Sequence, residues 1–331
     1  MLAVHYFRHK FLLFLAFFFI GFAGTLSAAE SAANFPSKPI KIIIPHMPGD
    51  TVDTIARTLS RDLGAAWGQP VVVESHPGAG GAIAAGMVAR APADGYTLLL
   101  TISSLVQNAV LRPSQKLDVF KDFTPVIRIA STPLAYIAHG ESPYNSVAEF
   151  IEAAKKEPGK RSYASYGLGT TAHIYYELLS DASDSDFLHV PYKGGNPILA
   201  DVMGRQVDTG LLSLSVSLPQ YKAGAIKILA IANDERFPSI PEVPTFAEAG
   251  YPALSGAGWV GMLAPGGTPQ PVVDKLAAQI TQSLEDPQVK SMFQDFAIQA
   301  APTTPAEMSA IIRSDYDKWS KVVKTYDIKV E

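Results

Sequence analysis

Three glycine-rich segments carry the residue types best suited to chemistry in this 331-residue sequence. They occupy positions 48–53, 77–81 and 167–171, and each follows an apolar run and precedes an amphipathic one. Glycine lets the backbone approach a ligand closely and adopt a positive φ. A helix that begins there presents unpaired backbone N–H groups and about half a positive charge. We therefore predict that the three segments converge on an anion, such as a carboxylate.

The same segments also have a purely structural interpretation. Glycine turns before helices are common, and Asp50 and Asp53 are residue types that cap helices. A single segment of this kind would indicate little more than a turn. Three in one chain favour a ligand site, and Thr170 and Thr171 add hydroxyl groups to the third segment.

The sequence lacks the usual signatures of a catalytic or metal site. It has no cysteine, which excludes thiolate nucleophiles and cysteine-based metal sites. The segment 78–83 resembles a dinucleotide-binding turn, but Ile83 stands where that turn needs glycine or alanine. His173 and Glu177 are four positions apart and could ligate a metal, although a packing or solvent contact is commoner. We expect a protein that needs no cofactor or metal and is not an enzyme.

Apolar runs typical of strands alternate with amphipathic runs typical of helices from position 38 onward. Strands are predicted at 40–45, 71–74, 96–101, 126–130, 134–138, 162–165, 187–190, 207–212, 226–232 and 259–263. Helices are predicted at 51–63, 82–90, 147–156, 171–180, 198–204, 271–285 and 305–325. Alternation at this spacing indicates right-handed βαβ units and mixed, mostly parallel sheets flanked by helices.

Two such series in succession indicate an α/β fold with two lobes and a ligand cleft between them. We assign residues 36–135 to the first part of lobe 1, 136–240 to lobe 2, and 241–331 to a return segment of lobe 1. Ligands of open α/β sheets bind beyond the carboxyl ends of the strands, where helices begin. Lobe 2 also holds a group of tyrosines, most of which we expect to pack and one or two to line the cleft: Tyr163, Tyr166, Tyr175, Tyr176 and Tyr192.

The segment 1–29 has the composition of a secretory signal peptide. Arg8 and Lys10 precede an apolar run at 11–22, and small residues precede a predicted cleavage site before Glu30. An uncleaved membrane anchor is the alternative, but the apolar run is short against the roughly 20 residues that span a bilayer. We therefore expect a periplasmic protein. The formal net charge of −4 argues against nucleic acid as a partner.

Motifs distributed from about position 35 to the end of the chain resemble those of a known family. They are Pro48-Gly49 with Asp53, Pro77-Gly78-Ala79-Gly80-Gly81, Ala93-Asp94-Gly95-Tyr96, Asp122-Phe123-Thr124-Pro125, Gly167-Leu168-Gly169-Thr170 with His173, Val190-Pro191-Tyr192-Lys193-Gly194, Gln206-Val207-Asp208 and Pro244-Thr245 with Glu248-Ala249-Gly250. Each is weak alone, but their order and spacing are specific. Together they resemble the Bug family, the periplasmic solute-binding proteins of tripartite tricarboxylate transporters.

The resemblance implies a type II-like periplasmic binding protein whose two lobes close on a small carboxylate. In the family, backbone groups and ordered water of the first two segments hold the ligand, and the third segment completes the site. The resemblance also implies delivery to a membrane permease with a large and a small subunit, and we expect the receptor to be a monomer. The ligand-binding residues that we predict are Met47, Gly49, Asp50, Thr51, Asp53, Gly78, Ala79, Gly80, Ser103, Gly169, Thr170, Thr171, His173, Tyr192 and Asp208.

Two departures from the family pattern leave the class of ligand open. Asp50 follows Gly49 where the family usually has a second glycine, and His46 replaces an apolar or aromatic residue. The Asp50 carboxylate would repel an anion, cap the helix, or pair with an ammonium group. A zwitterion, an amide or an aromatic acid is therefore as compatible as a di- or tricarboxylate. A partner of a membrane sensor kinase and an exported enzyme acting on a carboxylate are the alternative functions.

Overall fold

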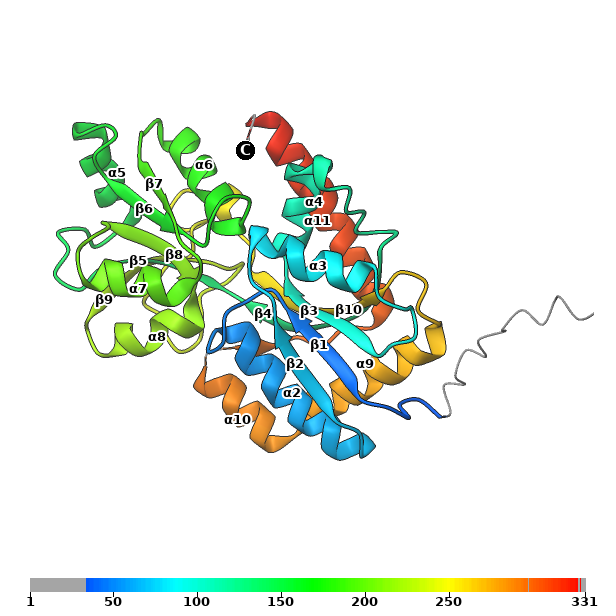
Figure 1. Ribbon diagram of the computed structural model, residues 1–331. Coiled ribbons are helices and arrows are strands. Elements are labelled where there is room, and N and C mark those ends of the chain that lie inside the picture. Colours follow the sequence, from blue (N-terminus) through cyan, green and yellow to red (C-terminus); the bar gives the residue numbers. More distant parts are fainter. Residues whose placement is uncertain (1–33, 297, 327, 329–331) are drawn as a thin grey trace, which may run out of the picture. The chain divides into compact units, whose positions relative to one another are not determined.

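The computed structural model describes residues 34–296, 298–326 and 328 (Figure 1). The signal segment predicted at 1–29 lies outside these residues. From Pro36 onward the chain forms one unit, which contains two β-sheets with helices packed against each of them. We call each sheet with its helices a lobe.

Six strands form the sheet of lobe 1, in the order β11-β4-β10-β3-β1-β2. They are β1 (Ile40–Ile44), β2 (Val71–Ser75), β3 (Thr97–Ile102), β4 (Phe123–Thr132), β10 (Gly258–Pro265) and β11 (Gln299–Ala300). Strand β1 pairs in parallel with β2 and β3, whereas β10 is antiparallel to β3 and β4. Four of the five residues of β1 are buried, as expected for an inner strand that is covered on both faces.

Five strands form the sheet of lobe 2, in the order β7-β6-β8-β5-β9. They are β5 (Leu134–His139), β6 (Ser162–Ser165), β7 (Leu188–Pro191), β8 (Thr209–Ser213) and β9 (Ile226–Ala232). The core of this lobe is aromatic, because the ring of Tyr136 lies 5.7–5.9 Å from the rings of Phe150, Tyr163 and Phe246. Tyr163, Tyr175 and Tyr176 are buried, so most of the tyrosine group packs in the core, as predicted.

Both sheets are mixed, so the expectation of mostly parallel pairing holds only for three neighbouring strands in each. Every antiparallel pair includes a strand that leads from one lobe to the other, namely β4 or β10 in lobe 1 and β5 in lobe 2. The chain enters lobe 2 directly from β4 through Pro133 into β5, and it returns to lobe 1 through residues 233–257 into β10. Each of β5 and β10 is antiparallel to both of its neighbours, because neither follows a helical crossover within its own sheet.

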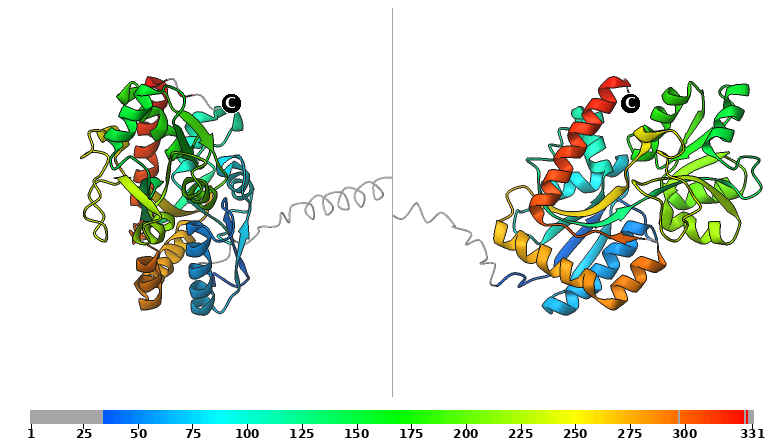
Figure 2. Two further views of the ribbon diagram at one scale, coloured as in Figure 1. Left: turned by 90° about the vertical axis from the view of Figure 1, so that its left-hand side faces the viewer. Right: turned by 180° about the vertical axis from the view of Figure 1, so that it is seen from behind.

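Helices cover both faces of the lobe 1 sheet (Figures 1 and 2). One face carries α2 (Thr51–Trp67), α9 (Gln270–Glu285) and α10 (Pro287–Asp295), and the other carries α3 (Ala82–Ala89), α4 (Ser104–Leu111) and α11 (Pro305–Thr325). Helix α2 buries Val52, Ile55 and Leu59 in the i, i+3, i+7 pattern of an amphipathic helix. It ends at Gly68, whose φ of 61° is the left-handed conformation that glycine adopts most easily.

The helices of lobe 2 are α5 (Val147–Lys156), α6 (Thr171–Ser183), α7 (Gly195–Met203) and α8 (Leu214–Lys222). Three short 3₁₀ turns complete the described structure: η1 (Ala79–Gly81), η2 (Pro113–Gln115) and η3 (Pro252–Leu254). Helix α7 packs on β8 and β5, and α8 packs on β9 and β5.

The predicted strands and helices are all present, with ends shifted by a few residues, but the sequence did not predict α4, α8, α10 and the two-residue strand β11. Pro219 lies inside α8, and proline disfavours a helix interior. No side-chain hydrogen bond caps the described start of α4. Helix α10 begins at Pro287, immediately after α9 ends, so its pattern merges with that of its neighbour.

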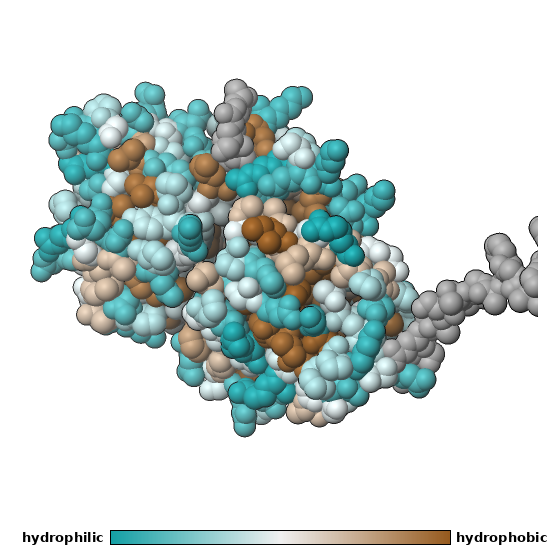
Figure 3. All heavy atoms as spheres, in the orientation of Figure 1, coloured by the Kyte–Doolittle hydropathy of each residue, from teal (hydrophilic) through white to brown (hydrophobic). Residues whose placement is uncertain are grey.

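The surface seen in Figure 3 is mostly hydrophilic, with separate apolar patches. Exposed large apolar side chains include Met47, Ile83 and Leu188. Within the described part of the chain, we find no helix that combines the length and apolar character needed to cross a bilayer.

Candidate functional site

A pocket lies between the two lobes, where the last residues of β3 and β8 meet the first residues of α2 and α6. It encloses about 60 Å³, which is room for roughly four to six water molecules. Lobe 1 supplies His46, Asp50, Thr51, Val52, Ile102 and Ser103, and lobe 2 supplies Tyr166, Thr170, Thr171, Ala172 and Ser213. The strands that connect the lobes supply Thr132, Leu134, Gly258 and Val260. This is the position predicted for a ligand, beyond the carboxyl ends of the strands.

Asp50 caps α2 and brings a negative charge to the pocket. Its Oδ1 accepts a hydrogen bond from the N–H of Thr51, and its Oδ2 lies 3.1 Å from Nδ1 of His46. Burial by itself raises the pKa of Asp50, but the hydrogen bond and charge of His46 and the N–H groups of Thr51 and Val52 outweigh burial. The pKa therefore lies below its ordinary value, and Asp50 is an anion at neutral pH.

Asp53 completes the hydrogen bonding of the first glycine segment. The N–H of Gly49 donates to Oδ2 of Asp53 at 2.9 Å, and Nε of Arg57 contacts the same carboxylate at 2.9 Å. Two amides of this segment, those of Gly49 and Thr51, are thus already bonded to its own carboxylates. In this segment the aspartates therefore cap the helix, as in the structural interpretation of the sequence. Because two of its N–H groups already have acceptors, its backbone is a poorer anion site than its composition suggests.

The opposite wall of the pocket is the start of α6. Thr170 caps this helix, because its Oγ1 accepts from the N–H of His173 at 3.3 Å and donates to the carbonyl of Gly167 at 2.8 Å. Thr171 and Ala172, the first two residues of α6, line the pocket. The first N–H groups of a helix have no acceptor within the helix, and they lie at its positive end. This wall therefore favours a negatively charged group.

Hydroxyl and amide groups join the two lobes around the pocket. Oγ1 of Thr51 lies 2.7 Å from Oγ of Ser215, which connects the start of α2 to α8. Nε2 of Gln107, in α4, donates to Oγ1 of Thr171 at 2.8 Å, and Oγ of Ser103 lies 3.5 Å from the same atom. The lobes thus meet through small polar groups that can separate and re-form.

The second and third glycine segments face each other across α4. Nδ2 of Asn108 donates to the carbonyl of Gly80 at 2.6 Å. A Cβ atom on Gly80 would lie 2.9 Å from Asn108, and one on Gly169 would lie 3.0 Å from it. The guanidinium of Arg112 donates to the carbonyls of Ala79 and Leu168, both at 3.3 Å. Helix α4 therefore holds the glycine segments of opposite lobes together.

Two histidines lie next to the third glycine segment, and one of them, His173, is hydrogen-bonded to it. Nδ1 of His173 accepts from the N–H of Gly169 at 3.3 Å, and its Nε2 lies 3.4 Å from Oε1 of Glu177. Nε2 of His189 lies 2.6 Å from Oγ of Ser165, and the rings of His173 and His189 are 4.8 Å apart. Both ring nitrogens of His173 are therefore engaged, Nδ1 with the glycine segment and Nε2 with Glu177 of α6. The residues described contain no group of histidine and acidic side chains suited to hold a metal ion.

The structure brings together five of the predicted site residues in the lining of the pocket: Asp50, Thr51, Ser103, Thr170 and Thr171. The pocket lining does not include the predicted residues Met47, Gly49, Asp53, Gly78, Ala79, Gly80, Gly169 and His173. The second glycine segment therefore does not converge on the pocket with the other two, contrary to the prediction. Tyr166 is the member of the tyrosine group that reaches the pocket. Its hydroxyl oxygen accepts a hydrogen bond from the N–H of Ser213.

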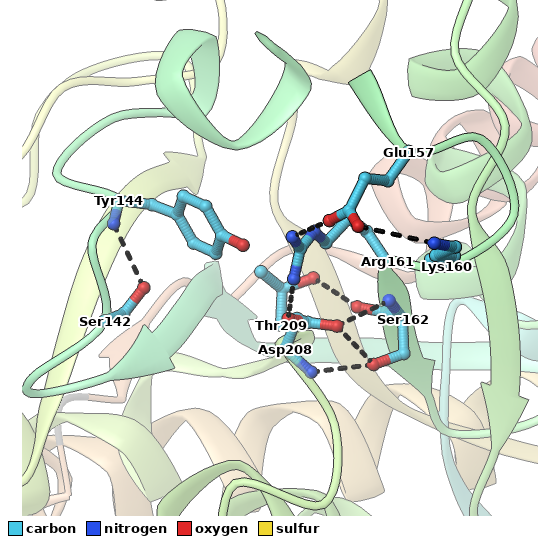
Figure 4. Close-up of polar contacts among 8 residues, drawn as sticks. All are labelled: Ser142, Tyr144, Glu157, Lys160, Arg161, Ser162, Asp208 and Thr209. Atoms are coloured by element: carbon cyan, nitrogen blue, oxygen red, sulfur yellow. Dashed lines mark hydrogen bonds and ion pairs between the residues drawn. The ribbon is translucent and has the colours of Figure 1, made fainter. Parts of the chain in front are cut away.

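Two predicted residues lie away from the pocket. Asp208 precedes β8, whose other end carries the pocket residue Ser213, and its Oδ2 accepts from the N–H and hydroxyl of Ser162 at 2.8 and 2.9 Å (Figure 4). The hydroxyl of Tyr192 donates to Asp201 at 2.6 Å, and burial together with this hydrogen bond raises the pKa of Tyr192 to about 12. Both side chains hold elements of lobe 2 together.

Most of the pocket residues that the sequence did not predict are apolar or lie on the connecting strands. Ile102, Leu134 and Val260 belong to strands that read as ordinary buried runs, so no motif marks them. Gly258 is needed for close approach, because a Cβ atom there would lie 3.2 Å from Oγ1 of Thr132. The sequence marks these residues as pocket residues only by their position, since each lies near the end of a strand where the chain passes between the lobes.

Two α/β lobes joined by crossing strands, with a pocket between helix starts, define a two-lobed binding protein. Residues 55–328 match the tripartite tricarboxylate transporter family receptor. The chain is also 34% identical over 318 residues to protein BugT of Bordetella pertussis, which covers 95% of this chain and 96% of BugT. The chain belongs to this family of receptors, and the predicted resemblance to the Bug proteins is confirmed.

Solved structures agree with this assignment. The periplasmic binding protein BugD is 31% identical, with a TM-score of 0.83 over 90% of this chain and 100% of BugD. An R. palustris protein solved with adipate is 31% identical, with a TM-score of 0.83 over 89% of this chain and 99% of that one. Members of the family are periplasmic solute receptors and not enzymes.

The Arg112 contacts predict an effect on lobe closure. Arg112→Ala removes one hydrogen bond between lobes, the bond to the carbonyl of Leu168, which is worth roughly 0.5–1.5 kcal/mol, so we expect the dissociation constant of the ligand to rise about 2- to 10-fold. Arg128→Ala is the matched control, because Nε of Arg128 donates to the carbonyl of Ala301 within lobe 1. Calorimetry on both variants tests this, and an equal change in both would contradict it.

The partly buried His189 predicts a pH dependence of stability. Burial, and then the charge of His173, lower the pKa of His189 from 6.5 to about 4. Between these values the unfolded chain binds the proton and the folded chain does not, so stability falls as pH decreases from 6.5 to 4. His189→Gln should lose less stability over this range in thermal unfolding. If the unmodified protein and the variant lost the same thermal stability between pH 6.5 and 4, His189 would not be responsible for the pH dependence.

Proposed function

We propose that the chain is an exported receptor that captures a small organic carboxylate between its lobes and delivers it to the membrane permease of a tripartite tricarboxylate transporter. In this proposal the segment 1–29 directs export and is removed. The observation that carries the proposal is the pocket between the lobes, bounded on one side by the start of α6.

The chemistry of the α6 wall suits a carboxylate. Its first N–H groups and the hydroxyls of Ser103 and Thr171 lie on one side of the pocket. Hydrogen bonds to a charged acceptor are shorter and stronger than those between neutral groups. The R. palustris relative solved with adipate, a carboxylate, supports the same class of ligand here.

Binding between lobes couples capture to closure. A ligand that contacts both α2 and α6 stabilises the closed arrangement, in which Thr51 meets Ser215 and Arg112 meets Leu168. Ligands shift such an equilibrium by their difference in affinity for the two states. A permease can then recognise the closed, loaded receptor by its shape.

We expect one or more compounds from a panel of organic acids and amino acids to bind with a micromolar or lower dissociation constant. The ligand should also reduce the radius of gyration in solution scattering, because the lobes close on it. Isothermal calorimetry measures the first effect, and mass spectrometry of co-purifying compounds identifies a starting ligand. A panel that gives neither heat nor compaction would contradict a receptor role.

Delivery to a permease has its own test. Cells that lack the gene for this chain should take up the identified ligand much more slowly, and the full-length gene should restore uptake. A gene without the segment 1–29 is the matched control and should fail to restore it, because the receptor would not be exported. Unchanged uptake in the deletion strain would contradict delivery while leaving ligand binding intact.

A further inference from the structure

The Asp50 carboxylate and the first turn of α6 line one pocket from opposite lobes. We propose that this pocket selects a zwitterionic ligand, an amino acid or a close analogue, with its ammonium group at Asp50 and its carboxylate at α6. This inference rests on the proposed function and names the class of ligand within it.

The Asp50 end is suited to a cation. An ionised carboxylate offers about four acceptor positions. The N–H of Thr51 and Nδ1 of His46 occupy two of them, and the backbone of Val52 contributes a further hydrogen bond. At least one acceptor position of the Asp50 carboxylate is left, and an ammonium group would supply a further donor and a positive charge for it.

The same end disfavours a second carboxylate. Among the described residues that line the pocket, Asp50 alone is acidic and His46 alone can carry a positive charge. His46 already contacts Asp50, so it is not free to bind a ligand anion. The side chain of Asp50 is only 19% exposed, and solvent screens buried charges weakly. A dicarboxylate spanning the pocket would place one of its charges against Asp50.

The α6 end is suited to an anion for a separate reason. Gln107 is fully buried, and its Nε2 donates to Oγ1 of Thr171. Because that oxygen accepts from Gln107, the hydroxyl hydrogen of Thr171 is directed elsewhere, and Ser103 at 3.5 Å is a second hydroxyl of the lining. The hydroxyl groups of Ser103 and Thr171 line the pocket together with the positive end of α6.

The space between the two ends limits the part of the ligand between its charged groups to a small apolar group. Val52, Ile102, Leu134 and Val260 line this part of the pocket, so a short aliphatic side chain would be in contact with apolar groups. The volume of about 60 Å³ favours ligands of the size of alanine or valine over long dicarboxylates. Alanine and valine, with propionate and isovalerate as partners that lack the amino group, form two matched pairs of probes.

Calorimetry with these pairs tests the proposal. The unmodified protein should bind each amino acid about tenfold or more tightly than its partner acid, the effect of one favourable charge contact. Asp50→Asn should abolish most of this preference, since asparagine caps a helix as well as aspartate does but carries no charge. Asp286→Asn is the matched control, because Asp286 caps α10 through Gln288 and Val289, away from the pocket. It should keep the preference.

A second variant keeps the test decisive if Asp50→Asn does not fold. Asp50→Gly should shift the preference toward dicarboxylates such as succinate, with a fall of about tenfold in their dissociation constant. Equal binding of amino acids and their partner acids by the unmodified protein, or a preference that survives in both Asp50 variants, would overturn the proposal. Binding of carboxylates without amino-group preference would leave the proposed function standing, whereas no binding of any panel acid would overturn both.

Discussion

The charge of Asp50 at the start of α2 is the constraint on which the chemistry of the pocket depends. Helix starts attract anions, and both α2 and α6 begin at the pocket. At α2 that attraction is already satisfied within the chain, since Asp50 and Asp53 bond the amides of Thr51 and Gly49. At α6 the cap is the uncharged Thr170. Two similar helix ends thus become one negative and one positive wall.

The contacts between the lobes are of a kind that permits repeated opening. They join the hydroxyls of Thr51 and Ser215, and the side chains of Gln107 and Arg112 to Thr171 and Leu168. Each exchanges readily with water, so its net contribution is small, roughly 0.5–1.5 kcal/mol. Polar interfaces of this kind within a chain are compatible with relative motion. The closed arrangement is consequently one that a ligand can stabilise.

The sequence predicted the lobes and the glycine segments because their signals are local. Strand and helix patterns, and turns such as 77–81 and 167–171, depend on neighbours in the chain. The sequence could not show that Asn108 and Arg112 would bring these two turns together, because α4 has no cap or strong pattern of its own. Asp208 failed to reach the pocket for the converse reason. Its motif marks a structural bond to Ser162 at the other end of β8.

A ligand with unlike ends links selectivity to closure. A ligand that touched only α6 would bind the open and closed arrangements almost equally and would shift neither. A ligand whose ammonium group meets Asp50 while its carboxylate meets α6 gains both contacts only when the lobes come together, since these groups belong to different lobes. The contact at Asp50, which distinguishes a zwitterion from a simple acid, therefore also stabilises the closed state. Under the proposed function, a compound with only one of these groups is disfavoured twice, in binding and in producing the closed form that a permease would recognise.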